Sequence, residues 1–273
     1  MRWSRIALLI CLTSTCQSAE RASSSTTSLP VTTRDFAFET LDSVPAGRVR
    51  MVMTNAGPSY HHVQLIRWDR DLTWQQVVDS LPEDGAILPW MIPVGGIEGP
   101  DDYSLSVTVD LDLDAGVYLF ICRIWAPDKR AHSAYGMVRP LYVVGSGVPP
   151  PPRAANEVPI DLNEYAFTAP DTLRAGTHAL RVENRGREEH HIAVARLAPG
   201  KSAADAMREQ APNEPPAFVV VGGTASIGPG LHNTLHVSLA PGPYLLICFV
   251  LDRARVGKRH YELGMIRSLT VTN

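Results

Sequence analysis

The sequence contains an internal repeat, which constrains the fold more than any other feature. The pair His61-His62 recurs 129 residues later as His190-His191. The other recurring pieces are Ala46-Gly47 with Ala175-Gly176, Asn55 with Asn184, Gly95-Gly96 with Gly222-Gly223, Cys122 with Cys248, His132 with His260, and Met137 with Met265. Repeated order at a nearly constant offset predicts that one structural unit occurs twice in the chain.

A run of four prolines, residues 149–152, lies between the two copies. Consecutive prolines form a stiff, extended spacer, so we place a linker at residues 145–156. The predicted domains are then residues 31–144 and 157–273, and each is long enough to bury one hydrophobic core.

The amino terminus has the features of a secretory signal. A basic start is followed by the short apolar run 6–12 and by small residues up to Ala19. We predict a cleaved signal peptide at residues 1–19 and a flexible tether at 20–30. Lipid attachment at Cys16 is the alternative. Either way we expect an exported protein, periplasmic or extracellular, in which Cys122 and Cys248 are the principal cysteines.

Alternating polarity indicates β-strands in both copies. Residues 105–113 and 231–239 carry apolar side chains at odd positions, as half-buried strands do. Each copy also has one short helical candidate, introduced by the N-cap residues Thr73 and Ser202 with Gln76 and Asp205 three positions later. We therefore predict an all-β protein of two tandem Greek-key β-sandwich domains, each with a short helical insert.

The alternation also sorts the histidines. His61 and His190 share parity with apolar neighbours, which predicts that both point into a core. His62 and His191 are then expected to point outward. His232 and His236 fall on the polar face of their strand, and we expect them to be surface residues.

Each copy thus carries His, Cys, His and Met in the same order. An isolated inward histidine is usually a hydrogen-bonded core residue, and buried Cys and Met usually only pack. Joint recurrence of all four favours a ligand set. Two imidazoles, one thiolate and a weak thioether form a blue-copper electron-transfer centre. Zinc also accepts Cys and His but seldom Met.

Both copies resemble cupredoxins, the family of plastocyanin and azurin. The similarity lies in Asn followed by the first His, in the Gly-x-Tyr-x-x-x-Cys strand, and in the His-x4-Met loop. The resemblance implies copper bound by His61, Cys122, His132 and Met137 in the first domain, and by His190, Cys248, His260 and Met265 in the second. Nine and eleven residues separate Cys from the second His, against two to four in most of the family. We expect such loops to hold their histidine less firmly.

Several functions are disfavoured by the sequence. The net charge of -3 provides no basic field for nucleic acid. No apolar run reaches the ~18 residues of a membrane span, so we do not expect an integral membrane protein. The chain has no His-x-His pair, and neither cysteine is flanked by histidine. We therefore expect no oxidase or nitrite reductase activity and classify the protein as a non-enzyme.

The resulting expectation is an exported copper protein that carries single electrons or copper, together with an unidentified redox partner protein. The alternative is a metal-free binding or structural module whose two sites have degenerated. A disulfide between Cys122 and Cys248 is a further alternative, and it requires their Cα atoms to approach within about 7 Å.

Overall fold

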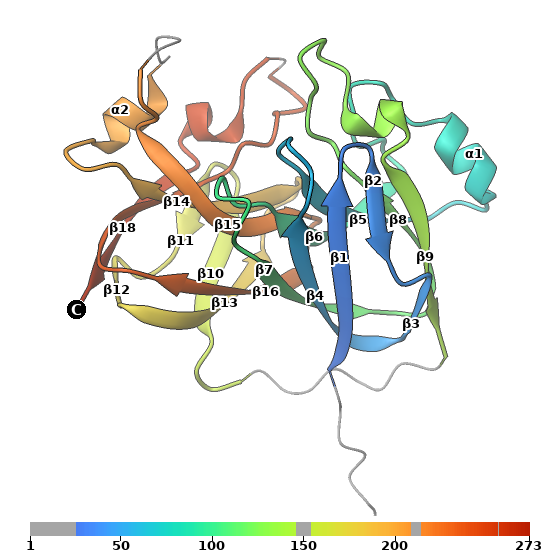
Figure 1. Cartoon of the computed structure of the whole chain (residues 1–273), viewed down its shortest axis with the longest axis horizontal. Helices are drawn as coiled ribbons and strands as arrows, with labels where there is room; N and C mark the ends of the chain where they lie inside the picture. Colours follow the sequence, from blue (N-terminus) through green and yellow to red (C-terminus); the bar gives the residue numbers. More distant parts are fainter. Residues whose placement is uncertain (1–25, 146–153, 209–213, 256) are drawn as a thin grey trace, which may run out of the picture.

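The computed structural model describes residues 26–145, 154–208, 214–255 and 257–273 (Figure 1). The first half contains β1 (Thr27–Arg34), β2 (Ala37–Thr40), β3 (Ser43–Pro45), β4 (Gly47–Asn55), β5 (His62–Trp68), α1 (Trp74–Asp79), β6 (Met91–Glu98), β7 (Val107–Leu113), β8 (Gly116–Ile121), the 3-10 helix η1 (His132–Tyr135) and β9 (Val138–Val144). The second half contains β10 (Val158–Asn163), β11 (Ala166–Thr168), β12 (Thr172–Arg174), β13 (Gly176–Asn184), β14 (His190–Leu197), α2 (Ala203–Met207), β15 (Phe218–Ile227), β16 (His232–Leu239), β17 (Gly242–Ile247), the 3-10 helix η2 (His260–Leu263) and β18 (Ile266–Thr272). The protein is all-β with two short helices, as the sequence predicts.

The two halves share both of their sheets. An 8-stranded sheet has the order β11-β10-β13-β16-β7-β4-β1-β2, and a 10-stranded sheet has the order β12-β18-β17-β14-β15-β6-β5-β8-β9-β3. Antiparallel pairs β16–β7 and β15–β6 join the halves, one pair in each sheet. Both sheets are mixed, because pairs such as β1–β4 in one and β3–β9 in the other are parallel. The halves therefore form one continuous double sandwich.

We call the junction formed by the strand pairs β16–β7 and β15–β6 the seam. The repeated glycines permit the close approach of strands there. Gly95 has a φ of 109°, and a Cβ built there would lie 1.8 Å from Oδ1 of Asn233 on β16. That amide oxygen accepts a hydrogen bond from the Gly96 N–H at 3.1 Å, and Asn233 Nδ2 donates to the Val94 carbonyl at 3.0 Å. Any side chain at Gly95 would displace Asn233 and break these links between halves.

One face of the seam carries two clusters of charged residues. Asp110 on β7 accepts hydrogen bonds from Arg50 at 2.7 Å and contacts His236 of β16 at 2.9 Å. Asp112 is bonded to Arg48 at 2.6 Å and lies 3.3 Å from His232. The prediction that His232 and His236 are plain surface residues is wrong in this respect. Both side chains are partly buried, because β7 of the first half of the protein lies beside their strand.

Both predicted helical inserts are present, and each begins at its predicted N-cap. Thr73 accepts a hydrogen bond from the Gln76 N–H, and Ser202 accepts one from the Asp205 N–H. In both helices the side chain of the third residue also accepts a hydrogen bond from the backbone N–H of the N-cap residue, which completes a capping box. Each helix packs a buried side chain, Val77 or Ala206, against its own half.

Several predictions concern the chain ends and the linker. The predicted signal peptide, Cys16 and most of the proline linker lie outside the described residues. Strand β1 begins at Thr27, so residues 27–30 belong to the sheet and not to the predicted tether 20–30. In the described part of the chain, no helix is both long and apolar enough to cross a membrane.

Candidate metal centres

The structure brings the three nitrogen and sulfur donors of each half together. In the first half, His61 Nδ1 lies 3.1 Å from His132 Nδ1. Cys122 Sγ lies 3.9 Å from His61 Nδ1 and 3.6 Å from His132 Nδ1. These separations define a small, preformed group of donors.

The second half repeats this geometry closely. His190 Nδ1 lies 3.0 Å from His260 Nδ1, and Cys248 Sγ lies 3.6 Å from His260 Nδ1. All three donor atoms lie within 4.8 Å of one another. Cys122 and Cys248 are both buried free thiols, so the disulfide alternative is excluded.

The two methionines lie where the chain returns from the histidine loop. The Met137 N–H bonds the His132 carbonyl at 3.1 Å, and the Cys122 N–H bonds the Met137 carbonyl at 3.2 Å. Met265 makes the corresponding bonds. Its N–H donates to the His260 carbonyl at 2.9 Å, and its carbonyl accepts a hydrogen bond from the Cys248 N–H. Both methionine side chains are fully buried in the same core cluster as the cysteines. The backbone thus holds Cys, His and Met of each half side by side.

An asparagine at the end of a strand positions the first histidine of each centre. Asn55 closes β4, accepts a hydrogen bond from the Gly57 N–H at 2.9 Å and donates to the Ser59 carbonyl at 2.7 Å. Asn184 makes the equivalent bonds to Gly186 and to the Glu188 carbonyl. Each asparagine therefore fixes the loop that leads into His61 or His190.

The two ends of each long loop between Cys and the second His pair with each other. Trp125 pairs with Ala131 in one, and Leu251 pairs with Arg259 in the other. At the base, the His132 N–H bonds the Ile124 carbonyl at 2.8 Å, and the His260 N–H bonds the Val250 carbonyl at 2.8 Å. These backbone bonds place the second histidine next to the cysteine despite the length of the loop, and the expectation that such loops hold it less firmly stays a prediction.

An aromatic ring stands against the second histidine in each half. Phe36 meets the His132 ring edge-on at 5.3 Å, and Tyr165 meets His260 at 5.4 Å. Both aromatic residues have left-handed backbones, with φ of 64° and 58°. This strained conformation is uncommon for large side chains and occurs twice at the same place. It places a hydrophobic cover over each histidine.

Burial shapes the protonation of both centres. It raises the pKa of the Cys122 and Cys248 thiols to about 12. Burial, together with the charge of His260, lowers the pKa of His190 to about 4. Both centres therefore hold neutral imidazoles and protonated thiols when metal-free, and a metal must displace the thiol proton as it binds.

The donor set fits copper. A neutral imidazole offers its lone pair from the nitrogen that carries no proton. His61 Nε2 lies 3.0 Å from Asp35 Oδ1, which assigns the ring proton to Nε2 and leaves Nδ1 free to bind metal. Two imidazoles with one thiolate and a nearby thioether match a type-1-copper-like centre.

Sequence reasoning missed the residues on the opposite side of β5 and β14. His62 and His191 were predicted to point outward, but they are only 8% and 7% exposed. They face the seam and contact one carboxylate, Glu98 of β6. The recurrence of His62 as His191 was the one signal in the sequence that these two histidines have a role. Glu98 gave no such signal, because Ala225 occupies the corresponding position in the second half.

No family model matches the chain, and no curated protein matches it. Among solved structures, it is similar to a reduced auracyanin from Roseiflexus castenholzii, with 22% identity over 44% of this chain and 100% of that chain and a TM-score of 0.30. Auracyanin A from Chloroflexus aurantiacus, described as a "blue" copper protein, has 23% identity over 42% and 99% of the two chains, with a TM-score of 0.29.

One similar solved structure covers most of this chain. A blue copper oxidase from Nitrosomonas europaea is 16% identical over 91% of this chain and 86% of that chain, with a TM-score of 0.26. The assignment of the fold rests on this chain's own features, namely its mixed sheets and its two His-Cys-His groups with their methionines. Both halves have a cupredoxin-like fold. Each cupredoxin-like half carries one type-1-copper-like centre at corresponding strand ends.

Proposed function

We propose that the protein is an exported copper protein that accepts and donates single electrons. The observation that carries this proposal is the preformed His-Cys-His group in each half, with its methionine alongside. Bound copper supplies a reversible one-electron couple. The chain's own residues hold the donors at fixed positions, so little rearrangement accompanies the change of charge.

Burial of the donors favours electron transfer over carriage of copper. Both cysteines and three of the four histidines are fully covered, and His132 is almost so. A metal carrier must expose its ion to an acceptor's ligands, whereas an electron crosses a thin layer of protein without ligand exchange. The backbone pairing beside each second histidine further opposes release of a bound ion.

We also propose that the protein is not an enzyme in its own right. A separate catalytic copper needs histidine nitrogens with free lone pairs. His62 and His191 do not offer such lone pairs toward the seam, because His62 Nε2 accepts the Arg123 N–H at 2.7 Å and His191 Nε2 accepts the Phe249 N–H at 2.6 Å. Electrons would then leave through a separate partner protein.

The test is a titration of metal-free protein with Cu2+, followed by visible absorption and metal analysis. We expect an intense thiolate-to-copper band that a reductant bleaches and an oxidant restores. Zn2+ should bind without colour. Failure to take up copper, or uptake without a reversible band, would overturn the proposal in favour of a metal-free module.

Export and the absence of oxidase activity have their own measurements. Mass spectrometry of protein from a fractionated cell should find the chain outside the cytoplasm and beginning near residue 20. A lipid-modified Cys16 would show a membrane-anchored form instead. Oxygen consumption by the copper-loaded protein with an artificial electron donor should not exceed that of free Cu2+.

A further inference from the structure

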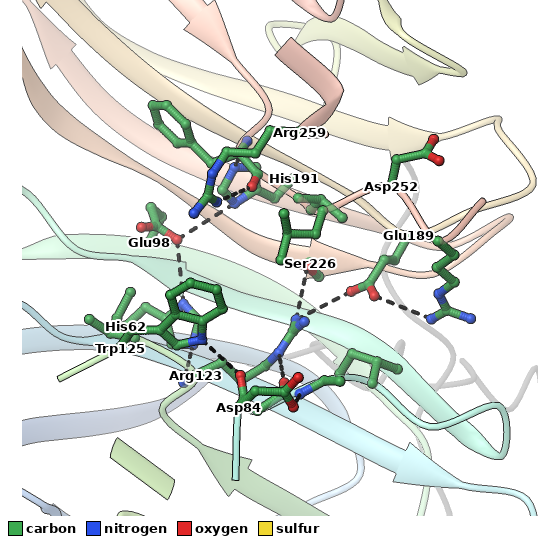
Figure 2. A pocket seen from close by; sticks show the side chains of 18 residues that line it. His62, Asp84, Glu98, Arg123, Trp125, Glu189, His191, Ser226, Asp252 and Arg259 are labelled. Atoms are coloured by element: carbon green, nitrogen blue, oxygen red, sulfur yellow. Dashed lines mark hydrogen bonds and ion pairs between the residues drawn. The ribbon is translucent and has the colours of Figure 1, made fainter. Parts of the chain in front are cut away.

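The seam contains a buried polar bridge between the two metal centres. Glu98 lies at the end of β6, where its backbone pairs with His62 on one side and with Gly223 of the second half on the other. Its Oε2 atom lies 3.5 Å from His62 Nδ1 and 3.6 Å from His191 Nδ1 (Figure 2). One carboxylate oxygen of the first half therefore contacts an imidazole from each half.

Each of these imidazoles is tied to its own centre in two ways. His62 is covalently bonded to His61 and accepts the N–H of Arg123, the residue that follows Cys122. His191 is covalently bonded to His190 and accepts the N–H of Phe249, which follows Cys248. The bridge therefore begins and ends next to two metal-ligand residues in each half.

The hydrogen bonds fix the orientation of both rings. The Nε2 lone pairs are used by backbone amides, so each neutral ring carries its proton on Nδ1 and directs it at Glu98. The Tyr60 hydroxyl donates a hydrogen bond to the other carboxylate oxygen of Glu98, Oε1, at 2.6 Å. Burial opposes ionisation of Glu98, but His191 and His62 outweigh it and hold the pKa of that carboxyl far below its usual value. A metal bound at the two Nδ1 atoms would have to displace both protons.

We propose that His62, Glu98 and His191 form a route by which an electron passes between the two copper centres. The inference rests on the proposed function, since it needs both centres loaded. One electron leaves the reduced centre and arrives at the oxidised one, and no bond forms or breaks. A dense, continuous path of bonds and short contacts carries an electron better than the surrounding packed side chains.

The bridge is distinct from the other links across the seam. The Arg123 side chain also crosses it, to Glu189 at 3.3 Å and to Ser226 at 3.4 Å, within the cavity of about 580 Å³ that Figure 2 shows. Asp110 and His236 cross it on the other sheet. The Arg123–Glu189 pair also joins two residues bonded to ligands, because Arg123 follows Cys122 and Glu189 precedes His190, whereas the Asp110–His236 contact does not.

The first measurement uses the metal-free protein and the variant Glu98→Gln. Nitrogen NMR should show His62 and His191 as Nδ1–H tautomers in the original protein. A glutamine side chain has the same shape and keeps one acceptor oxygen but carries no negative charge, so the Nδ1–H resonances of both histidines should shift. Unchanged Nδ1–H resonances of both histidines in the variant would show that Glu98 does not interact with the rings and would overturn the proposal.

The second measurement follows electron exchange between centres. The substitution Met265→Gln is introduced in every sample, because a changed axial ligand separates the second centre's absorption and potential from the first. After a pulse of reductant, Glu98→Gln should slow re-equilibration about tenfold, which corresponds to about 1.4 kcal/mol of barrier. Asp110→Asn is the matched control and should leave this rate unchanged, although it too removes a charge at the seam.

The outcomes separate the two proposals. Loaded centres that exchange electrons at the same rate before and after the Glu98→Gln substitution would overturn the route alone. Equal slowing by Asp110→Asn would also overturn it, because the effect would then come from loosening of the halves. Failure of both centres to bind copper would overturn the proposed function and the route with it.

Discussion

The two centres share their donors but differ in what surrounds them. In the first half, Asp35 holds His61 Nε2 at 3.0 Å and is itself bonded to Ser59. In the second half the equivalent Glu164 lies 3.9 Å from His190 Nε2, because its carboxylate is bonded to the Arg187 backbone N–H. Among the described residues, the Nε2 atoms of His190 and His260 are buried without a hydrogen-bond partner.

The carboxylates near the second centre gather instead around its other histidine. Glu188 lies 3.6 Å from His260 Nε2, and Asp252 is bonded to Tyr165, whose ring covers that histidine. In the first half, Phe36 stands in place of Tyr165 and has no hydroxyl to make such a bond. The comparison teaches that the two halves have the same ligands but different groups to orient them. The centres should therefore differ in affinity and potential.

The largest effect should come from removing one thiolate. Cys122→Ser should lose about one copper equivalent per chain and the first centre's visible band, because a hydroxyl is a poor substitute for the soft ligand. Cys248→Ser should do the same for the second centre. Metal analysis and spectroscopy on both variants measure the two centres separately. Loss of both bands from either single variant would show that the centres do not act as separate sites.

The next largest effect should come from removing the carboxylate that lies nearest the first histidine of each centre. Asp35→Ala should weaken copper binding at the first centre by about 10–100-fold, the usual consequence of losing a carboxylate partner of a ligating histidine. Glu164→Ala should weaken the second centre much less, since Glu164 is too distant for a hydrogen bond to His190. Competition with a chelator measures both affinities. Equal losses in the two variants would contradict the comparison.

Acid should affect both halves together through the seam. Burial alone would raise the pKa of Asp110 and of Asp112. Arg50 and His236 outweigh it at Asp110, and His232 and Arg48 outweigh it at Asp112, so that each pKa is lowered to about 2. The ordinary value of 3.8 applies to the unfolded chain. The stabilisation is therefore present above about pH 4 and lost as the pH falls from there toward 2.

Unfolding by urea at several pH values measures this loss. We expect one cooperative transition for both halves, and we expect the double variant Asp110→Asn, Asp112→Asn to show a weaker decline of stability in acid. Two separate transitions at neutral pH would break the comparison, because the halves would then be independent units.

The smallest effect concerns the helical inserts. Thr73→Ala and Ser202→Ala each remove an N-cap bond and should lower the free energy of unfolding by about 1 kcal/mol. Chemical denaturation measures the change, with Thr73→Ser as a control that keeps the cap hydroxyl. A much larger loss in one half would indicate that its helix supports more than its own turn.

Local patterns predicted much of this structure. Alternation identified the strands around Val107–Leu113 and His232–Leu239, and the cap residues Thr73 and Ser202 marked both helices. Such features depend on neighbours in the chain, so the sequence displays them. The repeat supplied the long-range information for the donor groups, since four recurring residue types in one order must meet for a shared reason.

The seam could not be predicted in the same way. Alternation placed His62 and His191 correctly on the face opposite the ligands, but it could not show that the other half covers that face. Glu98 carries no signal of its own, because Ala225 stands at the corresponding place. Contacts between halves depend on how two sheets align, and a residue found once has no pattern to reveal it.

The pairing of β6 with β15 and of β7 with β16 has a consequence for any shortened form of the protein. A single half produced alone would present two bare strand edges, each with unsatisfied amide and carbonyl groups. Such edges recruit whatever strand is available, so an isolated half should pair with another copy of itself or aggregate. Joining both halves in one polypeptide ensures that each edge meets its proper neighbour first.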